Sequence, residues 1–279
     1  MKLLEGKPIA NRIKEELKKR IQELKIKPVL ISIQVGENAG AESYAKSQKK
    51  TAENLGIDYQ FHKLNQETKE QELIDFIQRL NQDKGVNGII LQMPLPAQID
   101  YKKMSNFILP EKDAEGMHPM NMGKITFGKA RILPCTPAAV MELLKQTGVD
   151  LYGKEVVIVG HSEIVGKPLS LLLLEKFATV TVCHIGTSQA GKLEEHVKSA
   201  EILVVAVGKA GLIKGAWIKQ GAVVVDVGIN RVGDKIVGDV EFDQAVKRAS
   251  WITPVPGGVG PLTVIMLMCN VVEATKLQA

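Results

Sequence analysis

The stretch VVIVGHSEIVGKP, residues 156–168, combines the features of a strand, a tight turn and the start of a helix. Its apolar residues at 156–159 are typical of a short strand that is buried on both faces. Gly160 follows where a tight turn is needed, Ser162 can cap the next helix, and Pro168 suits an early helical turn. Main-chain N–H groups and the helix dipole at such a helix start attract a phosphate. The stretch therefore predicts an anion-binding turn.

The next strand is expected at 178–183, ATVTVC, so that strand, helix and strand fit within about 30 residues, the size of one βαβ unit. This arrangement resembles the first half of a dinucleotide-binding domain of the Rossmann type. The usual G-x-G-x-x-G pattern is incomplete, because Gly160 and Gly166 are present but Ser162 stands at the place of the second glycine. A plain α/β crossover that binds no ligand remains the alternative for this stretch taken alone.

Strand and helix patterns alternate along the rest of the chain, which predicts an α/β fold built from two α/β domains. We expect residues 1–120, together with the C-terminal helix 264–279, to form one domain and residues 121–263 to form the Rossmann-type domain. The helix at 264–277 is expected to pack back on the first domain, and the polar segment 112–124 reads as a loop at the domain boundary. Helices are predicted at 1–25, 41–55, 68–82 and 138–147, and strands at 29–35, 57–63, 88–91, 156–159, 178–183, 202–207 and 222–227.

Composition limits the classes of function. Three widely spaced cysteines without a C-x-x-C pair fit a reducing cytoplasm and argue against structural zinc. The N-terminus has no signal-peptide pattern, and no apolar run reaches the ~18 residues of a membrane span. The net charge of +5 comes from lysines that are mixed with glutamates on helices, and aromatic residues are few. We therefore expect a cytoplasmic protein without nucleic-acid or membrane partners.

Several positions outside the turn could line a binding site. Tyr44 and Gln48 share one helix face at i and i+4, although a half-buried tyrosine beside a surface amide would give the same pattern. The segment 92–96, QMPLP, leaves the end of a strand, where α/β proteins bind ligands. The segment 254–263, PVPGGVGPLT, combines glycines and prolines in a way that lets a flat ligand approach the main chain.

Asp113, Glu115 and His118 lie in the polar boundary loop, where a carboxylate can hold the N–H groups of a heterocycle. A metal site from these three residues is conceivable, but we expect none. The motifs G-x-S-x-G, Walker A and H-E-x-x-H are all missing, which removes the common hydrolase, nucleotide-triphosphatase and zinc-protease interpretations.

Taken together, the motifs closely resemble the methylenetetrahydrofolate dehydrogenase/cyclohydrolase family. The resemblance rests on PGGVGPLT at 256–263, DVGINR at 226–231, QMPLP at 92–96 and VVIVG-x-S-x-IVG-x-P at 156–168, and it extends from Gly36 to Asn270. It implies two α/β domains with a cleft between them, usually in a homodimer. The implied reaction oxidises 5,10-methylenetetrahydrofolate to the methenyl form with hydride transfer to NAD or NADP. Many members then hydrolyse the product to 10-formyltetrahydrofolate.

The resemblance also assigns residues to sites. It implies that the folate substrate contacts Tyr44, Gln48, Gln92, Met93, Glu115, Pro256, Gly257, Gly258, Pro261 and Thr263, of which Tyr44, Gln48, Gln92 and Glu115 are the catalytic candidates. It implies that the nicotinamide cofactor contacts Gly160, His161, Ser162, Ile164, His184, Ile185 and Ile229.

Three departures from the family pattern change the expectation. Gln48 stands where Y-x-x-x-K has the lysine that serves hydrolysis, and an amide cannot gain and lose a proton near neutral pH. We therefore predict that dehydrogenation survives and that cyclohydrolase activity is lost or very weak. A bifunctional enzyme, in which another group replaces the lysine, is the alternative.

The second departure concerns the cofactor: His161 stands where many NADP-using members have arginine, and Ile185 and Gly186 follow His184 without a cation for a 2′-phosphate. This favours NAD, with NADP as the alternative. The third departure is Glu115 in place of the aspartate of K-D-x-D-G, for which we predict a small shift of the folate without loss of binding. A catalytically silent folate-binding protein and a hydroxy-acid dehydrogenase are the rivals from other classes.

Overall fold

The structure is a computed structural model that describes residues 1–279. The chain forms two compact units, which we name by their sheets. The three-stranded unit contains residues 12–135 and 264–279, and the six-stranded unit contains residues 1–11 and 136–263. The boundaries between the units fall in three helices, which are α1 (Gly6–Gln22), α6 (Cys135–Thr147) and α11 (Val259–Gln278).

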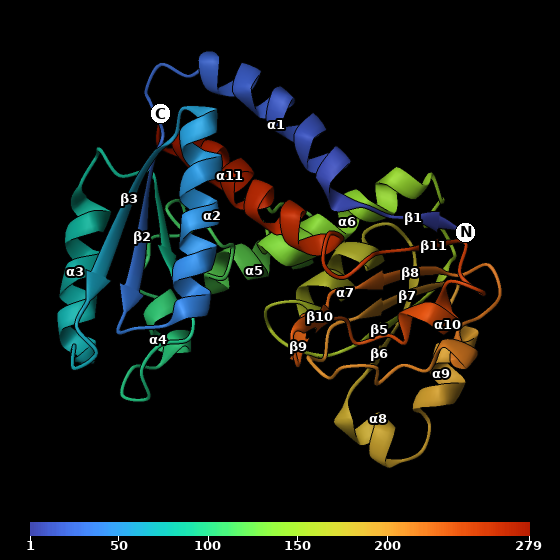
Figure 1. Cartoon of the computed structure of the whole chain (residues 1–279). Coiled ribbons are helices and arrows are strands. Elements are labelled where there is room, and N and C mark those ends of the chain that lie inside the picture. The colour runs from blue at the N-terminus through green and yellow to red at the C-terminus, as the bar shows by residue number, and fades with distance from the viewer. The chain divides into compact units, whose positions relative to one another are not determined.

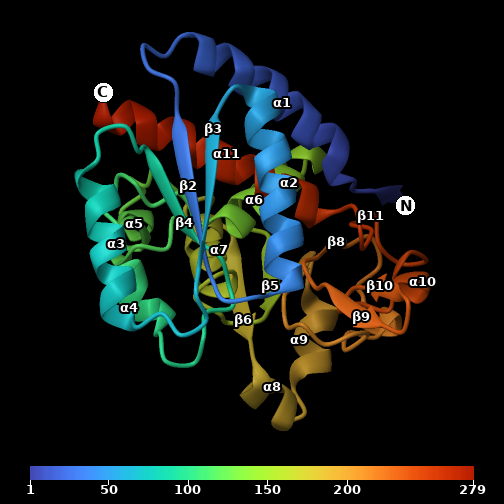
Figure 2. The same ribbon diagram turned by 60° about the vertical axis from the view of Figure 1, so that its left-hand side comes forward.

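The three-stranded unit is built on a small parallel sheet with the strand order β3-β2-β4. Helices α2 and α3 lie on opposite faces of this sheet (Figures 1 and 2). The elements of the unit, apart from the three boundary helices, are β2 (Val29–Val35), α2 (Ala39–Leu55), β3 (Asp58–Leu64), α3 (Glu70–Gln82), β4 (Gly88–Leu91), α4 (Tyr101–Ser105) and α5 (Pro119–Thr126).

The central strand β2 has two different buried faces. Ile31, Ile33 and Val35 point to the side of α3, where they form a core with Leu73 and Ile77. The alternate residues Ser32 and Gln34 are equally buried but polar, and they point to the opposite face. Because buried polar groups need partners, this second face can hold a polar site beneath α2.

The six-stranded unit contains a fully parallel sheet with the strand order β1-β11-β8-β7-β5-β6. A separate antiparallel hairpin joins β9 to β10. The elements are β1 (Lys2–Leu3), β5 (Glu155–Val159), α7 (Gly166–Leu174), β6 (Thr179–Cys183), α8 (Ile185–Gln189), α9 (Leu193–Ser199), β7 (Ile202–Val205), a 3₁₀ turn (Gly215–Trp217), β8 (Val223–Asp226), β9 (Asn230–Val232), β10 (Lys235–Val237), α10 (Phe242–Ala245) and β11 (Trp251–Ile252).

Strand β5 is the point where the chain changes direction across this sheet. The strand that follows it, β6, lies on one side, and the next strand, β7, lies on the other. Helices α9 and α10 pack against one face through a core that includes Val157, Leu203 and Val224. A parallel sheet of this kind binds ligands at the carboxyl ends of the strands beside the change of direction. The α/β class with a Rossmann-type unit is thereby confirmed.

The units differ from the expected domain boundaries at both ends of the first segment. Residues 1–11 join the six-stranded unit because Lys2 and Leu3 pair with Trp251 and Ile252 of β11. The expected single helix at 1–25 is therefore a short strand followed by α1. The second boundary lies at Cys135, because the segment after residue 120 still packs in the three-stranded unit. One example is Leu133, whose N–H donates to the side chain of Asn270.

The segment 112–124 is only partly the loop that was expected. Helix α5 begins at Pro119, and the Nδ1 atom of His118 accepts a hydrogen bond from the N–H of Met120 at 3.0 Å. A capping side chain before a proline is a helix-start signal, which the glycine and asparagine content of the segment obscured.

Helix α11 begins at Val259, earlier than the expected 264, and residues 264–279 belong to the three-stranded unit. It is the one helix long and apolar enough to cross a membrane by length and composition, and 67% of its apolar window is buried within the protein. The buried share is that of a core helix.

Candidate active site and cofactor pocket

A chain of four buried or half-buried polar side chains connects α2 to the polar face of the small sheet. Gln48 of α2 is completely buried. Its Oε1 atom accepts hydrogen bonds from the hydroxyl of Tyr59 at 3.0 Å and from the Nε2 group of Gln92 at 2.8 Å. The same Nε2 group of Gln92 donates to the hydroxyl of Ser32 at 2.9 Å. The structure therefore joins Gln48 and Gln92, which the sequence placed on separate elements.

The amide nitrogen of Gln48 is the unusual atom of this network. It is buried and has no hydrogen-bond partner within bonding distance and angle, although the Gln48 side chain lies near enough to the Tyr44 hydroxyl to lower the pKa of that phenol. An unpaired buried donor costs about 1–3 kcal/mol, so buried donors of this kind are rare in folded proteins. A polar atom of a bound molecule is the natural acceptor for it.

Tyr44 lies one helical turn before Gln48 and is half-buried. Burial raises the pKa of the Tyr44 phenol, and nearby Cys135 and Glu115 raise it further. Burial also raises the pKa of Tyr59 to about 12. Both phenols therefore keep their protons at neutral pH and serve as hydrogen-bond donors.

Glu115 lies within a loop that Asp113 holds in place. The carboxylate of Asp113 accepts hydrogen bonds from the N–H groups of Gly116 at 3.0 Å and His118 at 2.8 Å and from the side chain of Asn121 at 3.0 Å. The Asp113 carboxylate is thus occupied by hydrogen bonds, and His118 Nδ1 caps α5. Asp113 and His118 therefore do not converge with Glu115 on a common point. No group of three such side chains in the chain is arranged to hold a metal ion.

The carboxyl group of Glu115 is held from one side by Tyr101, whose hydroxyl lies 3.2 Å from Oε2. Burial raises the pKa of Glu115 to about 8, and the negative charge of Asp113 adds to the effect. Glu115 is therefore mainly a neutral carboxylic acid at pH 7. A neutral acid can both donate and accept a hydrogen bond, which suits the edge of a heterocycle.

Several residues of this site were not predicted from the sequence. Ser32 and Tyr59 complete the network of Gln48, and Tyr101 and Cys135 surround Glu115. The available signal was the pair of polar residues at 32 and 34 inside an otherwise apolar strand. Met93, which was expected to contact substrate, is 42% exposed in the loop after β4.

In the six-stranded unit, the turn after β5 requires both of its glycines. Gly160 has a φ of +127°, and a Cβ atom on it would lie 2.3 Å from the carbonyl oxygen of Ala206. A Cβ atom on Gly166 would lie 2.0 Å from the carbonyl oxygen of Gly160. These contacts give Gly160 the role of the turn glycine and Gly166 the role of the helix-packing glycine in a dinucleotide-binding turn.

The start of α7 differs in one detail from the expected cap. Ser162 Oγ accepts the N–H of Val165 at 3.1 Å, so it closes the turn before the helix, which itself begins at Gly166. The N–H groups of His161 and Ser162 donate to no protein group. They are thus available, beside the positive end of α7, for an anionic ligand.

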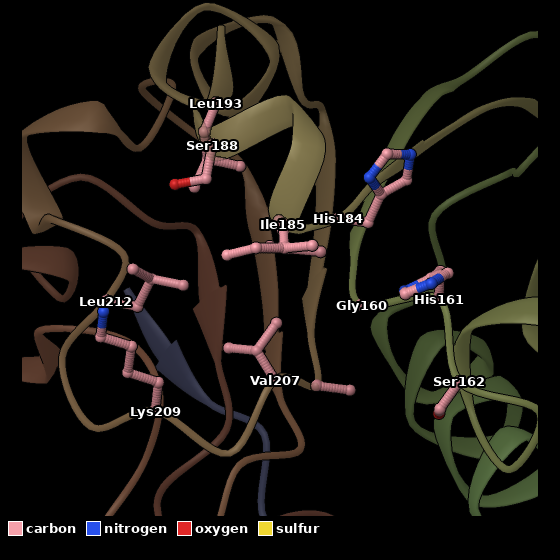
Figure 3. Close-up of a pocket in the computed structure, with 12 residues that line it drawn as sticks. Gly160, His161, Ser162, His184, Ile185, Ser188, Leu193, Val207, Lys209 and Leu212 are labelled. Atoms are coloured by element: carbon pink, nitrogen blue, oxygen red, sulfur yellow. The ribbon is translucent and has the colours of Figure 1, made fainter. Parts of the chain in front are cut away.

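A pocket of about 350 Å³ opens at the carboxyl ends of β5, β6 and β7. Figure 3 shows His161 and His184 on one side of it, with Lys209 and Leu212 facing them from the other. The imidazole rings of the two histidines lie 5.2 Å apart, and His184 Nδ1 accepts the N–H of Gly186 at 3.1 Å. The lining consists of Val159, Gly160, His161, Ser162, His184, Ile185, Ser188, Leu193, Ala206, Val207, Lys209 and Leu212.

Five of the residues expected to bind the cofactor line this pocket, and two do not. The five that line it are Gly160, His161, Ser162, His184 and Ile185. Ile164 is 48% exposed in the turn before α7, and Ile229 is 68% exposed between β8 and β9, and neither is part of the lining. The third wall, formed by the loop after β7 with Val207 and Lys209, was not predicted from the sequence.

A buried carboxylate fixes this third wall. The Oδ2 atom of Asp239 accepts the N–H groups of Val207 at 2.7 Å and Gly208 at 2.9 Å. Its Oδ1 atom accepts the side-chain amide of Asn230 at 2.8 Å. Asp239 thus ties the DVGINR segment to the pocket loop.

The segment 254–263 belongs to the six-stranded unit, whereas Tyr44, Gln48, Gln92 and Glu115 belong to the three-stranded unit. The carbonyl oxygen of Gly257 accepts the N–H of Gly6 at 2.9 Å, and a Cβ atom on Gly6 would lie 1.9 Å from the carbonyl oxygen of Gly258. Gly6 therefore has to be a glycine beside this segment, whereas a Cβ atom on Gly258 would meet Thr253 at 2.7 Å. Contact of Pro256, Gly257, Gly258, Pro261 and Thr263 with substrate stays a prediction.

The glycine turn, the open helix start and the pocket at the strand ends define a dinucleotide-binding unit, and the second unit adds a buried polar site. Comparison with known proteins gives the particular family. Residues 4–115 match the domain family described as "Tetrahydrofolate dehydrogenase/cyclohydrolase, catalytic domain". Residues 134–279 match the family described as "Tetrahydrofolate dehydrogenase/cyclohydrolase, NAD(P)-binding domain". The "Bifunctional protein FolD" of Acetivibrio thermocellus is 51% identical over 100% of this chain and 98% of its own length.

Solved structures agree with this comparison. The bifunctional enzyme FolD, a methylenetetrahydrofolate dehydrogenase/cyclohydrolase from Campylobacter jejuni, is 44% identical with a TM-score of 0.96 over 100% of both chains. The Trypanosoma brucei enzyme complexed with NADP cofactor and inhibitor is 38% identical with a TM-score of 0.93, over 98% of this chain and 96% of that one. This chain belongs to the tetrahydrofolate dehydrogenase/cyclohydrolase family. It is an enzyme of the methylenetetrahydrofolate dehydrogenase class with a nicotinamide-cofactor domain.

Proposed function

We propose that this enzyme oxidises 5,10-methylenetetrahydrofolate to 5,10-methenyltetrahydrofolate and has little or no cyclohydrolase activity. The observation that carries the proposal is Gln48, which is buried in the site and bonded through its amide oxygen to Tyr59 and Gln92. An amide in these contacts neither takes up nor releases a proton at neutral pH. Hydrolysis of the methenyl group needs such an ionisable group, whereas oxidation does not.

A bound nicotinamide supplies the hydride acceptor of the oxidation. The protein's own contribution is to bind and orient the folate and to exclude water, because the cation formed is stabilised by its two adjacent nitrogen atoms. Tyr44 supplies an aromatic surface, and Gln92 and Glu115 supply hydrogen-bonding groups for the pterin ring. The free amide N–H of Gln48 donates to a polar atom of the same ligand.

Neighbouring lysines do not replace the missing group. Lys46 and Lys49 are exposed and line a surface cavity that touches the network only through Tyr59, and no hydrogen bond joins either lysine to Gln48 or Gln92. Gln48 is the residue of α2 that reaches the buried network. The alternative is a bifunctional enzyme like its named relatives, and it requires an ionisable group from elsewhere in the site.

A paired assay on one preparation distinguishes the two. We expect oxidation of methylenetetrahydrofolate at a substantial rate and hydrolysis of methenyltetrahydrofolate at the uncatalysed rate. The variant Gln48→Lys should gain hydrolysis, and the variant Gln48→Met, of similar size but not ionisable, should not. Wild-type hydrolysis well above the uncatalysed rate would overturn the proposal and support the bifunctional alternative.

We further propose that the enzyme prefers NAD to NADP. A 2′-phosphate would be gripped at the end of the second strand of the Rossmann unit, which is β6 here. That end carries His184, Ile185 and Gly186, and His184 uses Nδ1 to accept the N–H of Gly186. The cation that the pocket does contain, Lys209, comes from the loop after β7 on the other side. The ratio of kcat/KM with the two cofactors tests this, and a clear NADP preference would refute it.

We also propose a cytoplasmic homodimer without nucleic-acid or membrane partners. Support comes from exposed apolar side chains on and beside the β9–β10 hairpin, where Ile229, Val232 and Ile236 are 68%, 53% and 47% exposed. Their burial against a second copy would remove apolar surface from water. Light scattering on the wild type and on Ile236→Asp measures the oligomeric state, and a wild-type monomer would contradict the proposal.

A further inference from the structure

Tyr101 and Glu115 form a contact that joins α4 to the loop between α4 and α5. The hydroxyl of Tyr101 lies 3.2 Å from Oε2 of Glu115, and Oε1 of Glu115 has no hydrogen bond to the protein. The main chain on both sides of Glu115 is fixed independently. Ala114 accepts a hydrogen bond from the side chain of Asn270 at 2.9 Å, and Gly116 donates to Asp113 at 3.0 Å. With the main chain fixed, Tyr101 decides where the Glu115 carboxyl group lies.

The length of the Glu115 side chain matches this contact. The family pattern has aspartate here, and aspartate is shorter by one carbon–carbon bond of about 1.5 Å. A carboxyl group drawn back by that distance would be too far from the Tyr101 hydroxyl for a hydrogen bond. The extra methylene of Glu115 and the phenol of Tyr101 therefore depend on each other.

We propose that Tyr101 is a positioning residue for the folate site, which holds Oε2 of Glu115 so that Oε1 is presented to the pterin ring. The Tyr101–Glu115 pair takes the place of the single aspartate in the family pattern. The inference rests on the proposed function, because it assigns the ligand of Glu115 to the folate of that reaction.

The surroundings of Glu115 fix which form of the carboxyl group is presented. The titratable groups that interact with it are Tyr44 of α2, Tyr101 of α4, Asp113 of its own loop and Cys135 at the start of α6. All four are acids, so nothing near Glu115 favours its charged form except the hydrogen bond from Tyr101. The phenol donates to Oε2, and the proton of the neutral acid then resides on Oε1. The pair thus offers the ligand an O–H donor.

Steady-state kinetics of Tyr101→Phe, Glu115→Asp and the double variant test the pairing. Each single variant should raise the KM for methylenetetrahydrofolate about tenfold, the effect of one lost hydrogen bond, with kcat and the KM for the nicotinamide cofactor nearly unchanged. The double variant should be no worse than the single variants, because both remove the same contact. Tyr152→Phe, at a 70% exposed tyrosine, is the matched control and should change nothing. Effects that multiply to about a hundredfold in the double variant would overturn the pairing.

The pH profile separates positioning from a merely structural role. The pKa of Glu115 is raised above its ordinary value to about 8, so the donor form is present below pH 8 and is lost as the pH rises through it. The KM for folate should therefore rise as the pH is raised above about 8, which gives the pH profile an alkaline limb. Because the Tyr101 hydrogen bond lowers the pKa of Glu115, Tyr101→Phe should move this limb to higher pH. An unmoved limb would overturn the inference.

A measurement without substrate keeps the inference testable if the proposed function fails. The infrared carboxyl signal that disappears in Glu115→Gln reports the titration of Glu115 in the free protein. Tyr101→Phe should shift that titration to higher pH. An unchanged titration refutes the Tyr101–Glu115 contact, whereas absence of oxidation by the wild type refutes the proposed function.

Discussion

Replacing Asp239 by asparagine should both destabilise the six-stranded unit and weaken cofactor binding. Asp239 is completely buried and accepts three hydrogen bonds, from Val207, Gly208 and Asn230. An asparagine whose oxygen faces the two main-chain N–H groups turns its NH₂ group toward the NH₂ group of Asn230. One hydrogen bond to a charged acceptor is then lost, at a cost of about 1.5–3 kcal/mol. The other two hydrogen bonds lose the negative charge of their acceptor, which roughly doubles the strength of a hydrogen bond.

These losses sum to about 3–5 kcal/mol. Part of this loss is offset, because the substitution also removes the repulsion between the Asp239 charge and Asp226. The pKa of Asp226 is raised to about 6 by burial and, in smaller part, by the charge of Asp239. We therefore expect Asp239→Asn to lower the free energy of unfolding by about 3 kcal/mol. Because Val207 lines the pocket, the KM for the nicotinamide cofactor should rise more than the KM for folate.

Urea unfolding at pH 7 and steady-state kinetics measure the two effects. Asp234→Asn is the control, since Asp234 is exposed in the turn of the β9–β10 hairpin. If Asp239→Asn unfolds within about 0.5 kcal/mol of the wild type and keeps its cofactor KM, then Asp239 does not hold the pocket loop.

Two further substitutions test other parts of the structure. Gly160→Ala should abolish measurable cofactor binding in a fluorescence titration. The added methyl group would meet the Ala206 carbonyl oxygen at 2.3 Å, and the positive φ of residue 160 disfavours any side chain. Normal binding would refute the assignment of the turn. Lys112→Met should lower the free energy of unfolding by about 2–4 kcal/mol in urea titrations, whereas the exposed control Lys84→Met should not, and equal effects would contradict this account. The buried Lys112 ammonium donates three hydrogen bonds, to the carbonyls of Leu80, Asn81 and Asp83.

Local patterns predicted the central elements well and the distant pairings poorly. The strands expected at 29–35 and 88–91 coincide with β2 and β4, because continuous apolar runs bounded by polar turns are a strong signal. Strand β1 has only two residues, and its existence depends on pairing with Trp251 and Ile252 at the far end of the sequence. No local pattern contains that information, so the domain to which residues 1–11 belong could not be predicted.

The functional sites show the same division. The i, i+4 spacing put Tyr44 and Gln48 on one helix face, and the resemblance put Gln92 beside them. The partner that completes the network, Tyr59, lies on a strand whose sequence shows no sign of its role. Asp239 escaped notice for the same reason, since a buried carboxylate that binds main-chain N–H groups has no sequence signature. Ile229 was expected at the cofactor; it is 68% exposed and lies outside the pocket lining, so its contact with the cofactor stays a prediction.

The hydrogen bonds around Gln48 are those of an amide, so the lysine of Gln48→Lys has to rearrange them before it can act in hydrolysis. Its oxygen accepts from Tyr59 and from Gln92, and an ammonium group accepts nothing, so a lysine at this position would require both partners to reverse their hydrogen bonds. Gln92 can present its amide oxygen to the lysine by turning its amide group. The Gln92 nitrogen would then need a new acceptor in place of Gln48. The two hydrogen-bond partners of Gln48 are a phenol and an amide, so neither would balance the positive charge of a lysine. Gln48 is therefore bonded as an integral part of this site, and the separation of oxidation from hydrolysis follows from the proton that its amide cannot carry.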